Sequence, residues 1–199
     1  DIKDISVGMG SDERIGGRFL RAGPAYGGSC FPKDTRALIN TANQFKTDLS
    51  IVKSVVKSND KRKILLTKKL ENILNNKLKN KVITFLGVTF KPNTDDMREA
   101  SSIPMIKYLN KNNSKIRYHD PSGEKNEFKK LKNVKYYKDI HSACFNSDLI
   151  VLHTEWNDFR LLNFKKLVKN SNFKIFDMRN MYSPAKMKNL KIKYFGIGR

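Results

Sequence analysis

One cysteine lies in a glycine-rich turn and is followed closely by two charged residues. The run is Gly27-Gly28-Ser29-Cys30-Phe31-Pro32-Lys33-Asp34. Paired glycines let the backbone approach a ligand closely, and they bring the cysteine to the start of the helix expected to follow. A helix start carries partial positive charge, which together with Lys33 favours the reactive thiolate of Cys30. Asp34 follows one helical turn later, close enough to handle a proton or orient a water molecule.

Two interpretations of this cysteine are open. Gly-Gly-x-Cys by itself would favour a small buried cysteine in a turn, with the aspartate as a helix cap. Because a lysine and an aspartate both stand beside Cys30, we favour a nucleophile. The second cysteine, Cys144, lies on a short apolar helical face and is predicted to be a core residue.

A second charged run follows a predicted strand. It reads Phe90-Lys91-Pro92-Asn93-Thr94-Asp95-Asp96-Met97-Arg98-Glu99. The carboxylates in this run could suggest a metal cluster. We interpret them instead as partners for Lys91 and Arg98, with Glu99 in the first turn of the next helix. No metal site is predicted, because the three histidines are scattered and the two cysteines are far apart, without metal-ligand spacing.

The remaining patterns predict where these residues are held. Residues 34–75 read as a short helix and then a long one, with a break at 46–50. From residue 81 onward, apolar β-rich runs alternate with helical patterns, which predicts a Rossmann-like, parallel α/β sheet preceded by a helical segment. The predicted strands are 82–87, 116–118, 149–152, 173–176 and 192–195, and the predicted helices between them include 101–112, 139–146 and 164–170.

Sheets of this kind bind ligands at the carboxyl ends of their strands. Site residues are therefore expected just after Gly87, Leu152 and Phe176. The segment 75–80 is the predicted domain boundary, so the two predicted domains are 1–78 and 79–199.

The chain is strongly basic, with 40 Lys and Arg against 19 Asp and Glu and a formal net charge of +21. The basic residues are spread out and lack aromatic interleaving, so we interpret them as solvated faces and predict no nucleic-acid partner. Such a surface would still help to collect a diphosphate substrate. No apolar run approaches the roughly 20 residues that cross a bilayer, so no membrane association is predicted. Two isolated cysteines fit a reducing, cytoplasmic setting.

Both charged runs resemble signatures of the UDP-glucose/GDP-mannose dehydrogenase family. Two later motifs also look like UDP-glucose-type members and occur in the same order: Thr154-Glu155-Trp156-Asn157-Asp158-Phe159-Arg160 and Asp177-Met178-Arg179-Asn180. The related dehydrogenases of N-acetylated UDP-sugars usually have His before the cysteine, where Ser29 stands here. The resemblance therefore implies UDP-glucose as the substrate, with GDP-mannose second.

The resemblance implies an NAD-dependent, four-electron oxidation of UDP-glucose to UDP-glucuronate. Cys30 would trap an aldehyde as a thiohemiacetal and then form a thioester, which water hydrolyses. Asp34 would be an acid/base or water-orienting group, and Lys33 and Arg98 would contact NAD. The implied substrate-binding residues are Phe19, Leu20, Arg21, Ala22, Gly23, Tyr26, Gly27, Phe90, Lys91 and Arg179, together with Arg14, which would reach the neighbouring subunit's site.

The cofactor-binding domain is expected to lie outside this sequence. No Gly-x-Gly-x-x-Gly fingerprint follows a strand, and the chain begins at Asp1 rather than Met. Residues 1–78 are thus expected to belong to a central helical domain that forms a homodimer and carries the cysteine loop, and residues 79–199 to a UDP-sugar-binding domain. Alone, the chain should bind UDP-glucose weakly without reducing NAD. The alternatives are a GDP-mannose dehydrogenase and a basic, non-enzymatic binding module.

Overall fold

The computed structural model describes all residues from 1 to 199 and contains one six-stranded sheet. Its strands are β1 (Val82–Leu86), β2 (Lys115–His119), β3 (Val134–Tyr136), β4 (Leu149–Leu152), β5 (Lys174–Asp177) and β6 (Lys193–Phe195). The spatial order is β3-β2-β1-β4-β5-β6, and all neighbours are parallel. The predicted Rossmann-like α/β fold is confirmed. The strand order reverses between β1 and β4, which is where sheets of this kind place their ligands.

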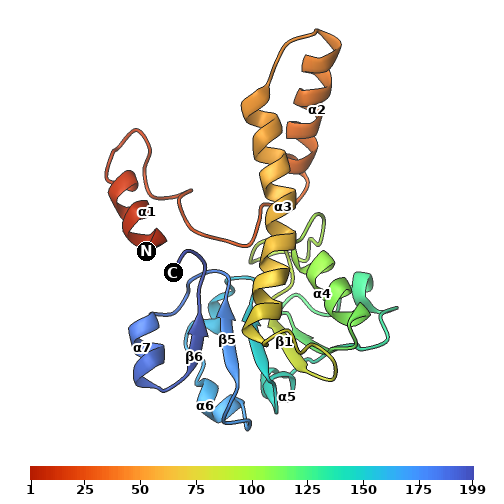
Figure 1. Ribbon diagram of the computed structural model, residues 1–199, viewed down its shortest axis with the longest axis vertical. Coiled ribbons are helices and arrows are strands. Elements are labelled where there is room, and N and C mark those ends of the chain that lie inside the picture. The colour runs from red at the N-terminus through yellow and green to blue at the C-terminus, as the bar shows by residue number, and fades with distance from the viewer.

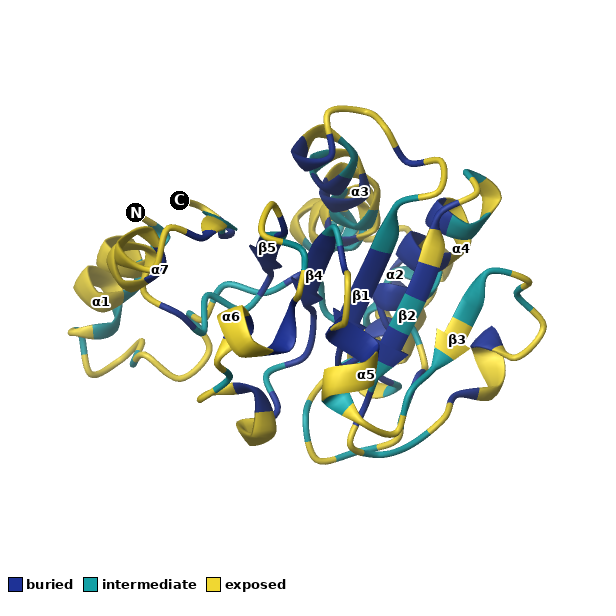
Figure 2. Ribbon diagram, turned by 90° about the horizontal axis from the view of Figure 1, so that it is seen from below, coloured by how far each residue is buried: buried dark blue, intermediate teal, exposed yellow.

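Helices cover both faces of this sheet. The helices of the chain are α1 (Ile2–Gly10), α2 (Cys30–Gln44), α3 (Ser50–Ile73), α4 (Ser102–Lys111), α5 (Ile140–Cys144), α6 (Phe164–Leu167) and α7 (Pro184–Asn189). α3 and α4 join the apolar cluster on one face, and α5, α6 and α7 join the cluster on the other. Figure 2 shows the buried strands between these layers. Because both faces are covered, β4 is apolar and buried at every position.

The long helix α3 connects the sheet to the cysteine segment. Its carboxyl-terminal half packs on the sheet through the buried side chains of Leu66, Leu70 and Ile73. Its amino-terminal half extends beyond the sheet and packs against α2, which begins at Cys30 (Figure 1). A single continuous helix therefore fixes the orientation of the cysteine segment relative to the sheet.

The amino-terminal helix α1 lies apart from the other helices, near the carboxyl terminus (Figure 1). The Ile2 amide donates to the Gly198 carbonyl at 3.0 Å, and Arg199 forms an ion pair with Asp1 at 3.2 Å. None of the α1 residues is buried. From α1 an extended segment crosses to α2 and brings residues 19–28 past the sheet. None of the helices combines the length and the apolar character that crossing a membrane requires.

The structure differs from the sequence-based predictions in several places, and α7 is one element that was not predicted. Strand β3 was not predicted, because Val134-Lys135-Tyr136 is short and only half-buried at the sheet edge. The predicted helix at 164–170 is a single turn, Phe164–Leu167. Glu99 does not lie in the first turn of a helix: α4 starts at Ser102, and Glu99 has a left-handed backbone with φ +54°.

Candidate active site

The helix α2 begins at Cys30, as the glycine turn predicted. Ser29 is the N-cap residue, and its Oγ lies 3.8 Å from the Cys30 Sγ. The cysteine side chain is exposed. The thiol therefore lies at the amino-terminal end of α2, beside the positive end of the helix dipole. Lys33 pairs with Asp34 at 2.7 Å, and this hydrogen bond raises the pKa of Lys33.

The two glycines before the cysteine are required by close packing. A Cβ at Gly27 would lie 2.7 Å from the Glu99 carbonyl oxygen, and one at Gly28 would lie 2.8 Å from the Phe90 ring. Gly28 also has φ +81°, and its amide donates to the Arg98 carbonyl at 2.8 Å. The cysteine segment therefore rests directly on the loop that carries the second charged run.

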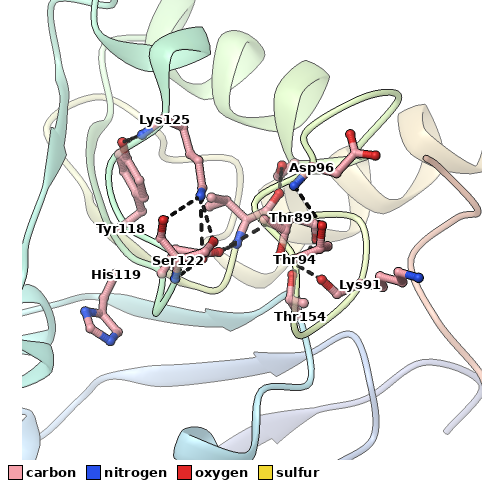
Figure 3. Close-up of polar contacts among 12 residues, drawn as sticks. Thr89, Lys91, Thr94, Asp96, Tyr118, His119, Ser122, Lys125 and Thr154 are labelled. Atoms are coloured by element: carbon pink, nitrogen blue, oxygen red, sulfur yellow. Dashed lines mark hydrogen bonds and ion pairs between the residues drawn. The ribbon is translucent and has the colours of Figure 1, made fainter. Parts of the chain in front are cut away.

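That loop leaves the sheet at the end of β1. Gly87 has φ +74°, and a Cβ there would lie 2.6 Å from the Thr154 Cβ, so only glycine fits. The loop then carries Phe90 and Lys91 over the strand ends. The Lys91 Nζ lies 5.4 Å from the centroid of the Phe90 ring, a cation–π contact. In Figure 3 the Lys91 side chain points away from the polar groups that hold the loop.

A buried carboxylate holds the start of this loop. Asp120, which directly follows β2, is fully buried and accepts from the amides of Val88 at 2.8 Å and Thr89 at 3.4 Å. Its other oxygen accepts from the Ser122 amide at 3.0 Å and also faces Lys125 at 3.8 Å (Figure 3). Dinucleotide-binding sheets use an acidic residue near this position for a ribose. Asp120 is already occupied by the protein's own donors.

A second buried network connects the β4 end to the same loop. The His153 Nε2 lies 2.8 Å from the Ser101 Oγ, and its Nδ1 lies 3.0 Å from the Thr154 Oγ1. Thr154 donates its hydroxyl to the Thr89 carbonyl at 2.6 Å, so it must accept from the Nδ1–H of His153. Burial lowers the pKa of His153 to about 3, which keeps the ring neutral.

Arg179, after β5, connects the ends of three strands. Its Nε donates to the His153 carbonyl at 2.9 Å, and its Nη2 donates to the Phe90 carbonyl at 3.1 Å. The Glu155 Oε2 lies 2.7 Å from the same Nε, an ion pair with poor hydrogen-bond geometry because that N–H points at His153. A Cβ at Gly23 would lie 2.9 Å from the Arg179 Nη1. The guanidinium thus fixes the relative positions of the β1, β4 and β5 loops.

A basic cleft of about 250 Å³ opens beside Arg179. Its lining includes Arg21, Arg160, Arg179 and Arg199, and Glu155 is its one acidic residue. Guanidinium groups bind phosphates through paired hydrogen bonds, so this cleft suits an anion such as a diphosphate. It lies at the carboxyl ends of β4 and β5, where the sequence predicted a site.

Side chains from α3 hold the segment between this cleft and the cysteine. Arg62 donates to the Gly23 carbonyl at 2.8 and 3.1 Å. The amide side chain of Asn59 exchanges two hydrogen bonds with the backbone of Tyr26, at 2.9 and 3.2 Å. Sequence reasoning missed both residues, because nothing distinguishes them from the many other Lys, Arg and Asn residues of the helix.

The structure brings most of the predicted site residues together, but not all of them. The residues at 21–30, Phe90, Lys91 and Arg179 converge at the strand ends. Two predicted residues lie apart from this cluster: the Phe19 side chain is 87% exposed, and Arg14 pairs with Asp12 at 2.6 Å. Arg98 is held by Asp96 through bonds of 2.8 and 3.0 Å, as the sequence predicted.

The predicted partners of Glu99 are corrected by the structure. Its carboxylate does not pair with Lys91 or Arg98. It bridges Arg36 of α2 at 3.0 Å and Lys63 of α3 at 3.1 Å. These cations stand 63 and 36 positions away in the sequence, beyond the reach of local patterns.

The α/β sheet has a basic cleft at its strand ends, and α3 connects it to a helix that begins at an exposed cysteine. This combination is typical of a nucleotide-binding protein with an appended reactive segment. Comparison with known families agrees. The UDP binding domain of the UDP-glucose/GDP-mannose dehydrogenase family matches residues 84–184, and the central domain of that family matches residues 1–61. The chain belongs to the UDP-glucose/GDP-mannose dehydrogenase family.

Individual relatives cover the whole chain. It is 38% identical to the UDP-glucose 6-dehydrogenase of Rhizobium meliloti and 41% identical to that of Rickettsia typhi, over 100% of this chain and 46% of each relative. The solved UDP-glucose dehydrogenase from Pyrobaculum islandicum superposes with a TM-score of 0.81 at 27% identity, covering 97% of this chain and 42% of that one. The chain thus spans about half the length of the curated relatives it matches.

Proposed function

We propose that this chain supplies the catalytic cysteine and the sugar-nucleotide site of an NAD-dependent UDP-glucose 6-dehydrogenase, which oxidises UDP-glucose to UDP-glucuronate. The observation that carries the proposal is the packing of the cysteine segment on the β1 loop. Gly28 donates to the Arg98 carbonyl, and both glycines lie against Phe90. This packing holds the cysteine turn against the loop that carries Lys91 and Arg98.

This chain supplies groups for the covalent and hydrolytic steps of the oxidation. A primary alcohol loses a hydride and a proton to become an aldehyde, and the Cys30 Sγ adds to the carbonyl carbon to form a thiohemiacetal. Loss of a second hydride together with the hydroxyl proton gives a thioester, and attack by water then releases the carboxylate, the thiolate and two protons. Asp34 lies one turn along α2 and serves as the acid/base or water-orienting group.

NAD, when bound, accepts the two hydrides. Of this chain, Arg98 and Lys33 would hold it. The Arg98 side chain is 67% exposed, and its guanidinium, oriented by Asp96, suits a pyrophosphate. The sheet itself offers no dinucleotide site, because Gly87 stands alone at the β1 end and Asp120 is buried. We infer that a separate domain, outside residues 1–199, binds most of the cofactor.

Three of the proposed substrate residues, Arg21, Ala22 and Arg179, line the basic cleft. We assign the diphosphate to Arg21, Arg179 and Lys91, and the sugar to the turn that contains Tyr26 and Gly27. Leu20, Ala22, Gly23 and Phe90 complete the proposed binding surface. We assign Phe19 to the sugar-nucleotide segment and Arg14 to a neighbouring subunit's site, since both are exposed here.

Two further features of the proposal concern the assembly. We assign residues 1–78 to a helical, dimerising part and residues 79–199 to the UDP-sugar part. Exposed apolar side chains on α2 and α3, such as Leu38, Ile51 and Val55, support a homodimer.

The two cysteines are free thiols, which fits a cytoplasmic enzyme. The proposal includes no nucleic-acid or membrane partner.

The experiment is a calorimetric titration of residues 1–199 with UDP-glucose, GDP-mannose and duplex DNA. We expect weak, saturable binding of UDP-glucose, weaker binding of GDP-mannose and no NADH production. Lys91→Ala should weaken UDP-glucose binding by about 10-fold, the value of one hydrogen bond to a charged group. Lys107→Ala, an exposed lysine on α4, is the matched control. Tighter binding of GDP-mannose or DNA than of UDP-glucose would overturn the proposal.

A further inference from the structure

Glu99 joins three parts of the molecule that lie far apart in the sequence. Its Oε1 pairs with Arg36 of α2 at 3.0 Å, and its Oε2 pairs with Lys63 of α3 at 3.1 Å. The Lys63 side chain is only 12% exposed, so this pair is better shielded from solvent than an ordinary surface pair. One carboxylate therefore connects the β1 loop to both helices that carry the cysteine segment.

The backbone of Glu99 is held in a conformation that a glutamate seldom adopts. Its φ is +54°, in the left-handed region that favours glycine. Such a conformation persists only where its surroundings over-determine it, and such sites concentrate near functional groups. Here the surroundings are the two ion pairs and the contact between the Glu99 carbonyl and Gly27.

The backbone beside Glu99 supports the turn that precedes the cysteine. The Arg98 carbonyl accepts the Gly28 amide at 2.8 Å, two residues before Cys30. If the Glu99 carboxylate released α2 and α3, this hydrogen bond would be the main remaining polar link between the turn and the loop. The Glu99 ion pairs thus add to the contacts of Arg62 and Asn59 that hold the segment before Cys30.

We propose that Glu99 is a positioning residue, which clamps α2 and α3 to the β1 loop and thereby fixes Cys30 relative to Lys91. The inference rests on the proposed function, because it assigns Cys30 to the chemistry. Glu99 touches no reacting atom. Its effect reaches the reaction through the geometry of the cysteine turn, and a misplacement of about 1 Å at a reacting group can cost about 100-fold in rate.

The first test measures the clamp without any activity. Hydrogen exchange of the Gly28 amide in residues 1–199 reports whether the turn still rests on the loop. Glu99→Gln should raise its exchange rate at least about 10-fold, while core amides such as that of Phe85 keep theirs, because only a local opening is affected. Glu124→Gln, whose exposed carboxylate pairs with Lys129 at 3.7 Å, is the control. Unchanged Gly28 exchange in Glu99→Gln would overturn the proposal.

The second test uses the complete dehydrogenase. Glu99→Gln should lower kcat by about 10- to 100-fold and leave the KM for UDP-glucose within about 3-fold, since the cleft residues are untouched. Glu99→Gly relieves the left-handed backbone but lacks the carboxylate, so its kcat should fall by as much as that of Glu99→Gln. A Glu99→Gly variant with the parent kcat would contradict the clamp.

The two proposals fail separately. If Cys30→Ser abolishes turnover but Glu99→Gln keeps the parent kcat, the positioning role of Glu99 is wrong and the proposed function stands. If Cys30→Ser turns over at the parent rate, the proposed function is wrong, and the exchange of the Gly28 amide alone decides whether Glu99 holds the turn.

Discussion

Replacing Asp120 by Asn should destabilise the sheet domain strongly while changing only one atom of its shape. The carboxylate is fully buried and lies 3.8 Å from the Lys125 Nζ, whose side chain is 4% exposed. At an effective dielectric constant of about 20, the loss of that charge costs about 4 kcal/mol. The value agrees with the roughly 3–5 kcal/mol measured when one partner of a buried ion pair is removed.

Equilibrium urea unfolding, followed by the fluorescence of Trp156, measures this loss. With a slope of about 2–3 kcal/mol per molar urea, the midpoint of Asp120→Asn should fall by about 1.3–2 M. The exposed Asp158→Asn should change the free energy of unfolding by less than about 0.5 kcal/mol. Adding Lys125→Met to Asp120→Asn should restore part of the loss, because no unpaired buried charge remains. A loss below about 1 kcal/mol in Asp120→Asn would refute the reasoning.

Two further predictions concern buried groups near the site. Gly28→Ala should lose stability and UDP-glucose affinity by calorimetry, because its Cβ would meet the Phe90 ring at 2.8 Å; Gly16→Ala, with φ +66° in open space, should show only the backbone cost of about 1–2 kcal/mol. Because burial lowers the pKa of His153 to about 3, the unfolded chain binds a proton that the folded chain rejects. His153 should therefore lower the free energy of unfolding, measured with urea, by about 1.4 kcal/mol per pH unit as the pH falls from about 6.5 toward 3. His153→Gln should remove this contribution, and His141→Gln should keep it.

The sequence sufficed for features that depend on local pattern. The start of α2 at Cys30 follows from its glycine turn, and the apolar runs of β1 and β4 follow from burial on both faces. Alternation of strands and helices then predicted a parallel sheet, because a helix between two strands returns the chain to the same end of the sheet. The cleft beside Arg179 lies at the carboxyl ends of two of the predicted strands.

Features that depend on partners far apart in the chain could not be predicted from the sequence. Asp120 is occupied by amides that lie 32 and 31 residues earlier, and Glu99 pairs with Arg36 and Lys63 across two helices. Neither pairing has a periodic or compositional signal, because a single carboxylate can pair with any of 40 basic side chains. The edge strand β3 was missed for a different reason: its alternation is too short to exceed the turn-rich background.

The two cysteines provide the sharpest contrast within the chain. Cys30 is exposed at a helix start, whereas Cys144 is fully buried and desolvation raises the pKa of its thiol to about 12. The Cys144 thiol therefore stays protonated and closed to a substrate at neutral pH, whereas the Cys30 thiol is open to one. A serine at position 144 should cost some stability through its buried hydroxyl and leave the chemistry intact.

The central claim is therefore tested most directly by steady-state NADH production in the complete dehydrogenase, with UDP-glucose as substrate, for Cys30→Ser and Cys144→Ser. The account predicts that Cys30→Ser loses turnover while its UDP-glucose affinity stays near that of the parent, because a serine hydroxyl is hardly ionised at neutral pH. Cys144→Ser should keep the parent kcat. Turnover of Cys30→Ser at the parent rate would contradict the account.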